Sequence, residues 1–77
     1  MWHKGYITIN GIRYFWEAKV YDEPSELGIN DGRISKLIII RESYGLEIQA
    51  SYCRGWDLEP TTPEAKQVLD IIMGRFT

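Results

Sequence analysis

An Asn-Gly pair, Asn10-Gly11, constrains the fold of this chain more than any other feature of its sequence. It lies between two runs rich in β-forming residues, residues 6–9 and 12–16. Both residues of a two-residue hairpin turn need a positive φ, which Asn and Gly adopt most readily. The sequence therefore predicts a β-hairpin in which residue 9 faces residue 12, and the remaining pairs follow in register.

This register sorts the side chains of the hairpin onto two different faces. The apolar face collects Ile7, Ile9, Ile12, Tyr14 and Trp16, with Ala18 and Val20 further along. The other face pairs Trp2 with Lys19, Lys4 with Glu17, Tyr6 with Phe15, and Thr8 with Arg13. Opposite charges and paired aromatic rings are favourable across neighbouring strands, and a slip of one residue would mix the two faces. We therefore predict one buried face and one face of aromatic and charged side chains.

Two further strands are predicted after a polar loop over residues 21–32, which contains Pro and Gly. Residues 33–41 hold a continuous apolar run, which is typical of a central strand covered at least partly on both sides. Residues 46–52 alternate between apolar and polar, which is typical of a strand with one solvated face. We expect Leu37 and Ile39 to extend the aromatic and charged face of the hairpin.

The connection between these two strands is predicted to be a three-residue loop, residues 43–45, with Gly45 in the left-handed conformation. The pairs that this loop produces are Ile40 with Ile48, Ile38 with Ala50, and Arg41 with Glu47. A two-residue loop would instead oppose Glu42 and Glu47, which is a repulsive arrangement.

A C-terminal helix is predicted from residue 63 onwards. Thr62 is a favourable N-cap, Pro63 suits the first helical position, and Glu64 favours the positive end of the helix dipole. One apolar stripe follows at helical spacing and consists of Ala65, Val68, Leu69, Ile72, Met73 and Phe76. We expect this helix to cover the apolar sheet face. The prediction is one ββββα domain over residues 1–77, of the α+β class, with a four-stranded antiparallel sheet in the order 1-2-3-4.

The composition of the chain argues against several classes of function. The 77 residues include 9 basic and 11 acidic ones, a net charge of −2, whereas a binder of phosphate backbones usually has a basic excess. His3 and Cys53 are the only histidine and cysteine, too few for a structural zinc site. A single cysteine favours a reducing compartment, and no apolar run reaches the length of a membrane span. We therefore expect a cytoplasmic protein that is not an enzyme, with no catalytic residue, metal, small-molecule cofactor or membrane contact.

The polar loop contains Gly28 and Gly32, whose spacing loosely resembles a phosphate-binding loop. A strand follows these glycines, so no helix N-terminus would direct its N–H groups at a phosphate. We interpret the glycines as turn residues.

The aromatic and charged sheet face is the first candidate binding surface. Its members are Trp2, Lys4, Tyr6, Arg13, Phe15 and Lys19, with Tyr21 at the rim. An exposed apolar patch usually marks an interface, so our leading hypothesis is contact with a protein partner or with a second copy of the chain. Aromatic rings between basic residues can also hold single-stranded nucleic acid, which is the alternative hypothesis. The acidic net charge favours the first.

The segment Arg54-Gly55-Trp56-Asp57 is the second candidate. In one interpretation Trp56 closes the open end of the core, Gly55 bends the chain, and Asp57 pairs with Arg54 or forms an Asx turn. If Trp56 is buried in this way, its replacement by Ala would cost about 3–5 kcal/mol. In the other interpretation Trp56 and Arg54 are contact residues, because these two types dominate interface energetics. The small core of a short chain favours the first interpretation, with Arg54 as the more available contact residue.

Three segments resemble a small uncharacterised domain found in Gram-positive bacteria and their phages or mobile elements. They are the Ser-x-x-Gly-Ile loop at residues 25–29, Gly-Arg-Ile-Ser-Lys-Leu at residues 32–37, and Arg-Gly-Trp-Asp at residues 54–57. Cys53 stands where that domain has an acidic residue. The resemblance implies a stand-alone accessory protein without an assigned activity. It also implies that residues 25–36 and 54–57 are neighbours in space.

Overall fold

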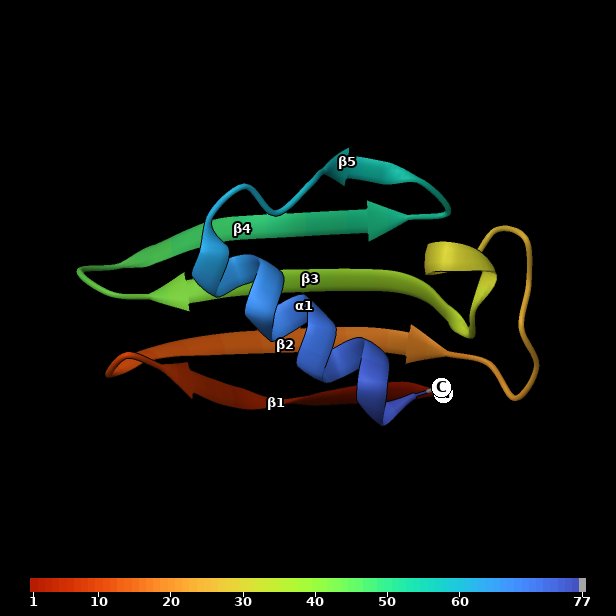
Figure 1. Ribbon diagram of the computed structural model, residues 1–77, viewed down its shortest axis with the longest axis horizontal. Coiled ribbons are helices and arrows are strands. Elements are labelled where there is room, and N and C mark those ends of the chain that lie inside the picture. The colour runs from red at the N-terminus through yellow and green to blue at the C-terminus, as the bar shows by residue number, and fades with distance from the viewer. Residues whose placement is uncertain (77) are drawn as a thin grey trace.

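A five-stranded antiparallel sheet in the order β1-β2-β3-β4-β5, with one helix lying diagonally across it, forms the fold (Figure 1). The computed structural model describes residues 1–76. Its elements are β1 (Trp2–Ile9), β2 (Ile12–Val20), η1 (Ile29–Asp31), β3 (Ile34–Glu42), β4 (Leu46–Cys53), β5 (Trp56–Leu58) and α1 (Pro63–Arg75). The predicted α+β class, antiparallel sheet and C-terminal helix are confirmed. The predicted number of strands is wrong, because the sheet has five strands and not four.

The additional strand is β5, which the sequence had placed in a loop. Its three residues pair antiparallel with β4, with Tyr52 opposite Trp56 and Ser51 opposite Leu58. The turn before it depends on Arg54, whose φ is +59°, whereas Gly55 is not among the residues with positive φ. A turn in which Arg adopts the left-handed conformation carries no sequence signal of the Asn-Gly kind.

The first hairpin has the predicted register throughout. Asn10 and Gly11 have φ values of +52° and +80°, as a two-residue turn with positive φ at both positions requires. The cross-strand pairs on the charged face are Trp2 with Lys19, Lys4 with Glu17, Tyr6 with Phe15, and Thr8 with Arg13. The register predicted from the turn and the side-chain pattern is therefore confirmed.

The β3–β4 hairpin is confirmed near its turn and wrong further along. Tyr44 and Gly45 both have positive φ in the three-residue loop, and Ile40 faces Ile48 as predicted. The register then shifts, so that Ile38 faces Ser51 and not Ala50. Gln49 is the extra residue of this bulge, since Ile40 pairs with residue 48 and Ile39 with residue 50.

The placement of Leu37 and Ile39 also differs from the prediction. Leu37 is 3% exposed and Ile39 is fully buried, and they face Ala18 and Trp16 of β2. They therefore lie on the covered face beneath α1, whereas Ile38 and Ile40 lie on the opposite face. The long connection over residues 21–33 leaves the register between β2 and β3 undetermined by turn geometry, so the sequence could not decide which isoleucines point which way.

Helix α1 covers the face that the sequence predicted. The Thr62 side chain accepts a hydrogen bond from the Ala65 N–H at 3.1 Å, and Pro63 occupies the first turn. Ala65, Val68 and Ile72 of the helix are fully buried. The core beneath them consists of Ile9, Tyr14, Trp16, Ala18, Val20, Ile29, Ile34, Leu37, Ile39, Ala50 and Tyr52. This packing leaves the other side of the sheet uncovered.

Candidate interaction surface

The sheet face opposite α1 is the principal candidate site, and we call it the outer face. Cross-strand partners share a face, so the strand register defines its members. They are Trp2, Lys4, Tyr6 and Thr8 on β1; Arg13, Phe15, Glu17 and Lys19 on β2; Lys36, Ile38, Ile40 and Glu42 on β3; Leu46, Ile48, Ser51 and Cys53 on β4; and Leu58 on β5.

The part of the outer face on β1 and β2 contains the aromatic and basic residues that the sequence predicted. The rings of Tyr6 and Phe15 lie 5.5 Å apart. The Arg13 guanidinium lies 4.6 Å from the centre of the Tyr6 ring and 2.8 Å from a carboxylate oxygen of Glu42. Trp2 and Tyr6 are 54% and 56% exposed, so their rings are available to a partner.

The part on β3, β4 and β5 is mainly aliphatic, and the sequence analysis assigned the wrong residues to it. Ile38 and Ile40 are half-buried, and they continue into Ile48, Leu46 and Leu58, which are all exposed. We had predicted Leu37 and Ile39 for this part of the outer face, but both lie on the covered face. The strict alternation of Leu46 and Ile48 was visible in the sequence, but the bulge at Gln49 places these two on the face opposite to Ala50 and Tyr52.

The net charge of the outer face has the opposite sign to the net charge of the whole chain. Four cations, Lys4, Arg13, Lys19 and Lys36, accompany two carboxylates, Glu17 and Glu42. This set of residues therefore has a net charge of +2, whereas the complete chain has −2. Lys19 and Lys36 stand directly opposite one another, which is an unfavourable pairing of like charges.

Tyr21 lies beside basic residues at this end of the sheet. Lys19 lies 5.5 Å from its ring centre and, through hydrogen bonding and its charge, lowers the pKa of the Tyr21 phenol below its usual value. The Ser35 hydroxyl and the charge of Arg54 also lower this pKa. Lys19 and Arg54 therefore both favour the ionised form of this phenol.

The segment from Arg54 to Asp57 does not join the outer face as a single site. Trp56 pairs with Tyr52 on the covered face, and the two rings meet edge to face with centres 5.0 Å apart. Trp56 is half-buried against the core, so it is a partial lid. Asp57 is exposed, and the ion pairs within residues 1–76 are Arg13–Glu42 and Arg41–Glu47, so Asp57 does not pair with Arg54. The Arg54 N–H donates to the Ser35 carbonyl at 3.1 Å, which makes residues 25–36 and 54–57 neighbours in space.

Replacement of Trp56 by Ala is expected to lower the free energy of unfolding by about 1–2 kcal/mol, through lost apolar burial and the lost contact with Tyr52. This is less than the cost of a fully buried Trp, because the side chain is only half-buried. Urea denaturation measures the difference, and Asp57→Ala, an exposed neighbour, is the control. A loss above about 3 kcal/mol would show that Trp56 is a full lid.

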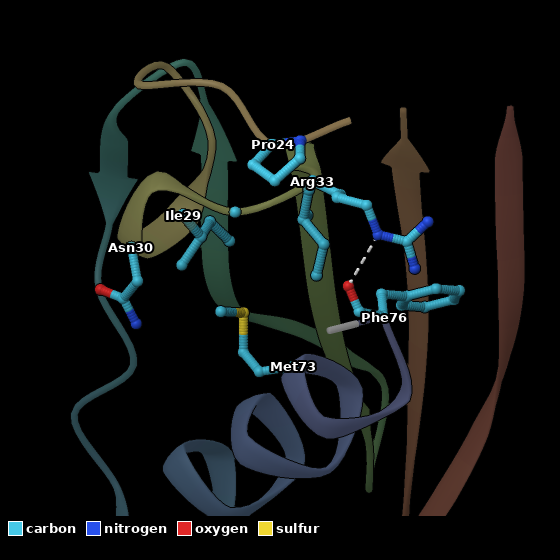
Figure 2. A pocket seen from close by; sticks show the side chains of 8 residues that line it. Pro24, Ile29, Asn30, Arg33, Met73 and Phe76 are labelled. Carbon is cyan, nitrogen blue, oxygen red and sulfur yellow. Dashed lines mark hydrogen bonds between the residues drawn. The ribbon is translucent and has the colours of Figure 1, made fainter. Parts of the chain in front are cut away.

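A cavity of about 340 Å³ lies between the loop before β3 and the C-terminal end of α1 (Figure 2). It is lined by Pro24, Ile29, Asn30, Gly32, Arg33, Ile34, Met73 and Phe76. Arg33 Nε donates a hydrogen bond to the Phe76 carbonyl at 3.1 Å. Sequence reasoning did not find this cavity, because its walls come from segments more than 40 residues apart.

The cavity is not suited to a phosphate, although it contains the loop with Gly28 and Gly32. Its walls are mainly apolar, and the helix end beside it is the C-terminus, which carries negative partial charge. An anion is favoured at the opposite helix end. The interpretation of the two glycines as turn residues agrees with the bonds from the Ser25 N–H to the Gly32 carbonyl and from the Gly28 N–H to the Ser25 carbonyl.

Within residues 1–76 no three His, Cys, Asp or Glu side chains lie close enough to hold a metal ion together. In the same part of the chain, no helix has the length and apolar character needed to cross a membrane.

The fold and the outer face define a small α+β domain in which one sheet face is covered by a helix and the other is open. A family model described as "Domain of unknown function (DUF7678)" matches residues 1–77. The chain therefore belongs to this uncharacterised family. No curated protein and no solved structure gives a significant match.

Proposed function

We propose that this protein is a non-enzymatic interaction module that binds a protein partner through its outer face. The observation that carries the proposal is the exposure of large apolar side chains on a regular sheet surface. Trp2, Tyr6, Leu46, Ile48 and Leu58 of this face are 43–75% exposed. Contiguous apolar patches of this kind usually mark interaction sites.

The composition of the outer face favours a protein over a nucleic acid. Single-stranded nucleic acid binds to aromatic rings and cations, and only β1 and β2 supply both. The aliphatic side chains of β3 and β4 offer nothing for bases to stack on. They match the apolar centre of a protein interface, for which the aromatic residues and Arg13 supply the side-chain types that interfaces favour.

Single-stranded nucleic-acid binding is the second candidate function. It is supported by the net charge of +2 on the outer face, by the exposed rings of Trp2 and Tyr6, and by Lys19 at 5.5 Å from the ring centre of Tyr21. Fluorescence anisotropy of labelled oligonucleotides at low salt tests it, because phosphate contacts are strongest there. Absence of binding at low salt removes this candidate.

The variant Ile48→Lys tests the proposed interaction. Ile48 is 52% exposed on the outer face, so the change is expected to alter stability by no more than about 0.5 kcal/mol. A lysine in the apolar centre of an interface leaves a desolvated charge, so capture of the partner is expected to fall at least tenfold. Ile71→Lys is the matched control, since Ile71 is 40% exposed on α1.

The measurement is quantitative mass spectrometry of proteins captured from the native host by wild type and by the two variants. A protein captured by wild type and by Ile71→Lys, but lost with Ile48→Lys, is the expected result. Identical capture by all three chains would contradict the proposal.

A further inference from the structure

The cavity between the loop before β3 and the end of α1 has a buried floor and a mouth that is open to solvent (Figure 2). Ile29 and Ile34, each 2% exposed, form the floor. Met73 is half-buried at the side, and Pro24 and Asn30 are exposed at the mouth. The side chains of Ile29 and Met73 point towards one another from the loop and the helix in Figure 2. A molecule can therefore enter from the solvent and reach an apolar interior.

Hydrogen bonds within the chain hold the walls of the cavity in place. The Ser25 N–H donates to the Gly32 carbonyl at 3.0 Å and closes the loop on itself. Arg33 Nε donates to the Phe76 carbonyl at 3.1 Å and joins the loop to the end of the helix. The cavity is therefore formed without a ligand, as small-molecule sites usually are.

The backbone beside the mouth has an unusual conformation. Asn30 and Asp31 have φ values of +53° and +57°. Asn and Asp tolerate a positive φ as single residues, but two in succession are rare. Backbone of this kind persists only where the surrounding structure holds it, and it is concentrated at functional sites. The conformation of the loop thus supports a binding role independently of the apolar lining.

The volume of the cavity defines the size of a ligand. An apolar cavity of about 150 Å³ is large enough to bind benzene and does not hold water. The cavity of this chain has about 340 Å³, roughly twice that volume, and lies within the range of small-molecule sites. It therefore fits a body of roughly ten non-hydrogen atoms, such as two fused rings.

The lining of the cavity offers no partner for a charged group. Arg33 is the one charged residue that lines it within residues 1–76. Its guanidinium extends towards Phe76 and away from Ile29 in Figure 2, and the Phe76 carbonyl accepts its Nε–H. That carbonyl lies at the negative end of the helix dipole, which stabilises the Arg33 charge outside the cavity. An ionised group between the apolar walls would lose its hydration without gaining a partner.

Exposed carboxylates adjoin the mouth of the cavity. Glu23 precedes Pro24, Asp31 follows Asn30, and both carboxylates are exposed. Neither forms an ion pair within residues 1–76. They repel an anionic ligand that approaches the mouth. The apolar interior and this acidic mouth together favour an uncharged molecule.

We propose that the cavity binds a small uncharged apolar molecule with a body of about ten non-hydrogen atoms. This inference goes beyond the proposed function, because none of the residues that line the cavity belongs to the outer face. The two sites are therefore tested separately, and failure of one leaves the other standing.

The first measurement is an NMR titration of the isotope-labelled chain with indole, an uncharged molecule of two fused rings, up to about 10 mM. Saturable shifts of the methyl signals of Ile29, Ile34 and Met73 are expected, with a dissociation constant on the order of 1 mM. Nuclear Overhauser effects between indole protons and these methyl groups locate the ligand. Absence of saturable shifts at these residues, or shifts confined to Trp2 and Tyr6 of the outer face, would overturn the inference.

The variant Met73→Trp tests whether the cavity is the site, because the larger side chain occupies part of its volume. The affinity for indole is expected to fall about tenfold or more. Ile71→Trp is the matched control, since Ile71 is 40% exposed on the same helix and does not line the cavity, and its affinity should equal that of wild type. Unchanged affinity in a folded Met73→Trp chain would contradict the inference. If melting curves show that this variant does not fold, the nuclear Overhauser effects in wild type decide the question.

Indole-3-carboxylate tests the charge of the ligand. It adds an anionic group to the same two rings, so its affinity is expected to be about tenfold lower or less than that of indole. Equal affinity for the two molecules would overturn the assignment of an uncharged ligand.

Discussion

Replacement of Trp16 by Ala is expected to lower the free energy of unfolding by about 3–5 kcal/mol, the usual cost of truncating a buried Trp. Trp16 is 1% exposed and is among the largest fully buried side chains of the domain. Its ring packs against Gly5, meets the edge of Phe76 with centres 6.0 Å apart, and lies beneath Arg75. It thus joins β1, β2 and the end of α1.

The total stability expected for a domain of this size is only about 4–12 kcal/mol. The Ala variant is therefore expected to lose a large part of this stability and to melt well below the wild-type chain, as measured by circular dichroism and urea titration. A loss below about 1 kcal/mol would show that the helix does not depend on this side chain.

Trp16→Phe is the informative control for this prediction. Trp16 Nε1 is buried and has no hydrogen-bond partner within residues 1–76. Phe keeps most of the apolar volume and removes that unsatisfied donor, so its expected cost is about 1–2 kcal/mol. A cost as large as that of Ala would show that the indole N–H has a partner that this arrangement does not reveal.

The elements predicted correctly are those whose signals are local. Asn10-Gly11 dictates a turn geometry, and the turn fixes every pair from Ile9 and Ile12 outwards. Thr62 and Pro63 likewise mark the start of α1 through capping chemistry. In both cases residues within a few positions of each other determine the local structure. The tertiary packing is consistent with that structure and does not change it.

The features predicted wrongly depend on non-local register. Ile38 and Ile39 have the same side chain, so sequence alone cannot show which of them faces the core. The choice is made by the pairing of Trp16 with Ile39 across a connection of 13 residues, Tyr21 to Arg33. The bulge at Gln49 and the short strand β5 arise in the same way, from packing between strands and not from turn residues.

The sequence therefore predicts only the part of the candidate site that lies on β1 and β2. Its aromatic and basic part follows from the first hairpin, and every member on β1 and β2 lies where the pattern placed it. The positions of the aliphatic side chains on β3 depend on the β2–β3 register, which the sequence does not determine. Trp56 was grouped with the binding residues but lies on the covered face, because β5 is a strand that turns it towards Tyr52.

Gly28→Ala is expected to destabilise the domain by about 2–3 kcal/mol, as overpacking against atoms that cannot move freely does. A Cβ at this position would lie 2.1 Å from the Gly32 carbonyl oxygen, which is a backbone atom. The φ of Gly28 is −82°, so the expected loss comes from this contact and not from the conformation of the residue. Moving Gly32 away breaks its hydrogen bond from the Ser25 N–H.

The effect of Gly28→Ala is expected to reach the core through Ile29, which is 2% exposed, and through the Tyr52 hydroxyl, which donates to the Leu27 carbonyl at 2.8 Å. Gly55→Ala is the matched control, because a Cβ there meets nothing within 4 Å and should change stability by less than about 0.5 kcal/mol. Urea denaturation gives both values, and amide hydrogen exchange at Ser25 and Gly28 locates the change. Equal stability of the two variants would show that the loop backbone moves to accept the added Cβ without destabilising the core. Because the loop contributes no residue to the outer face, Gly28→Ala should leave that surface unchanged below its melting temperature.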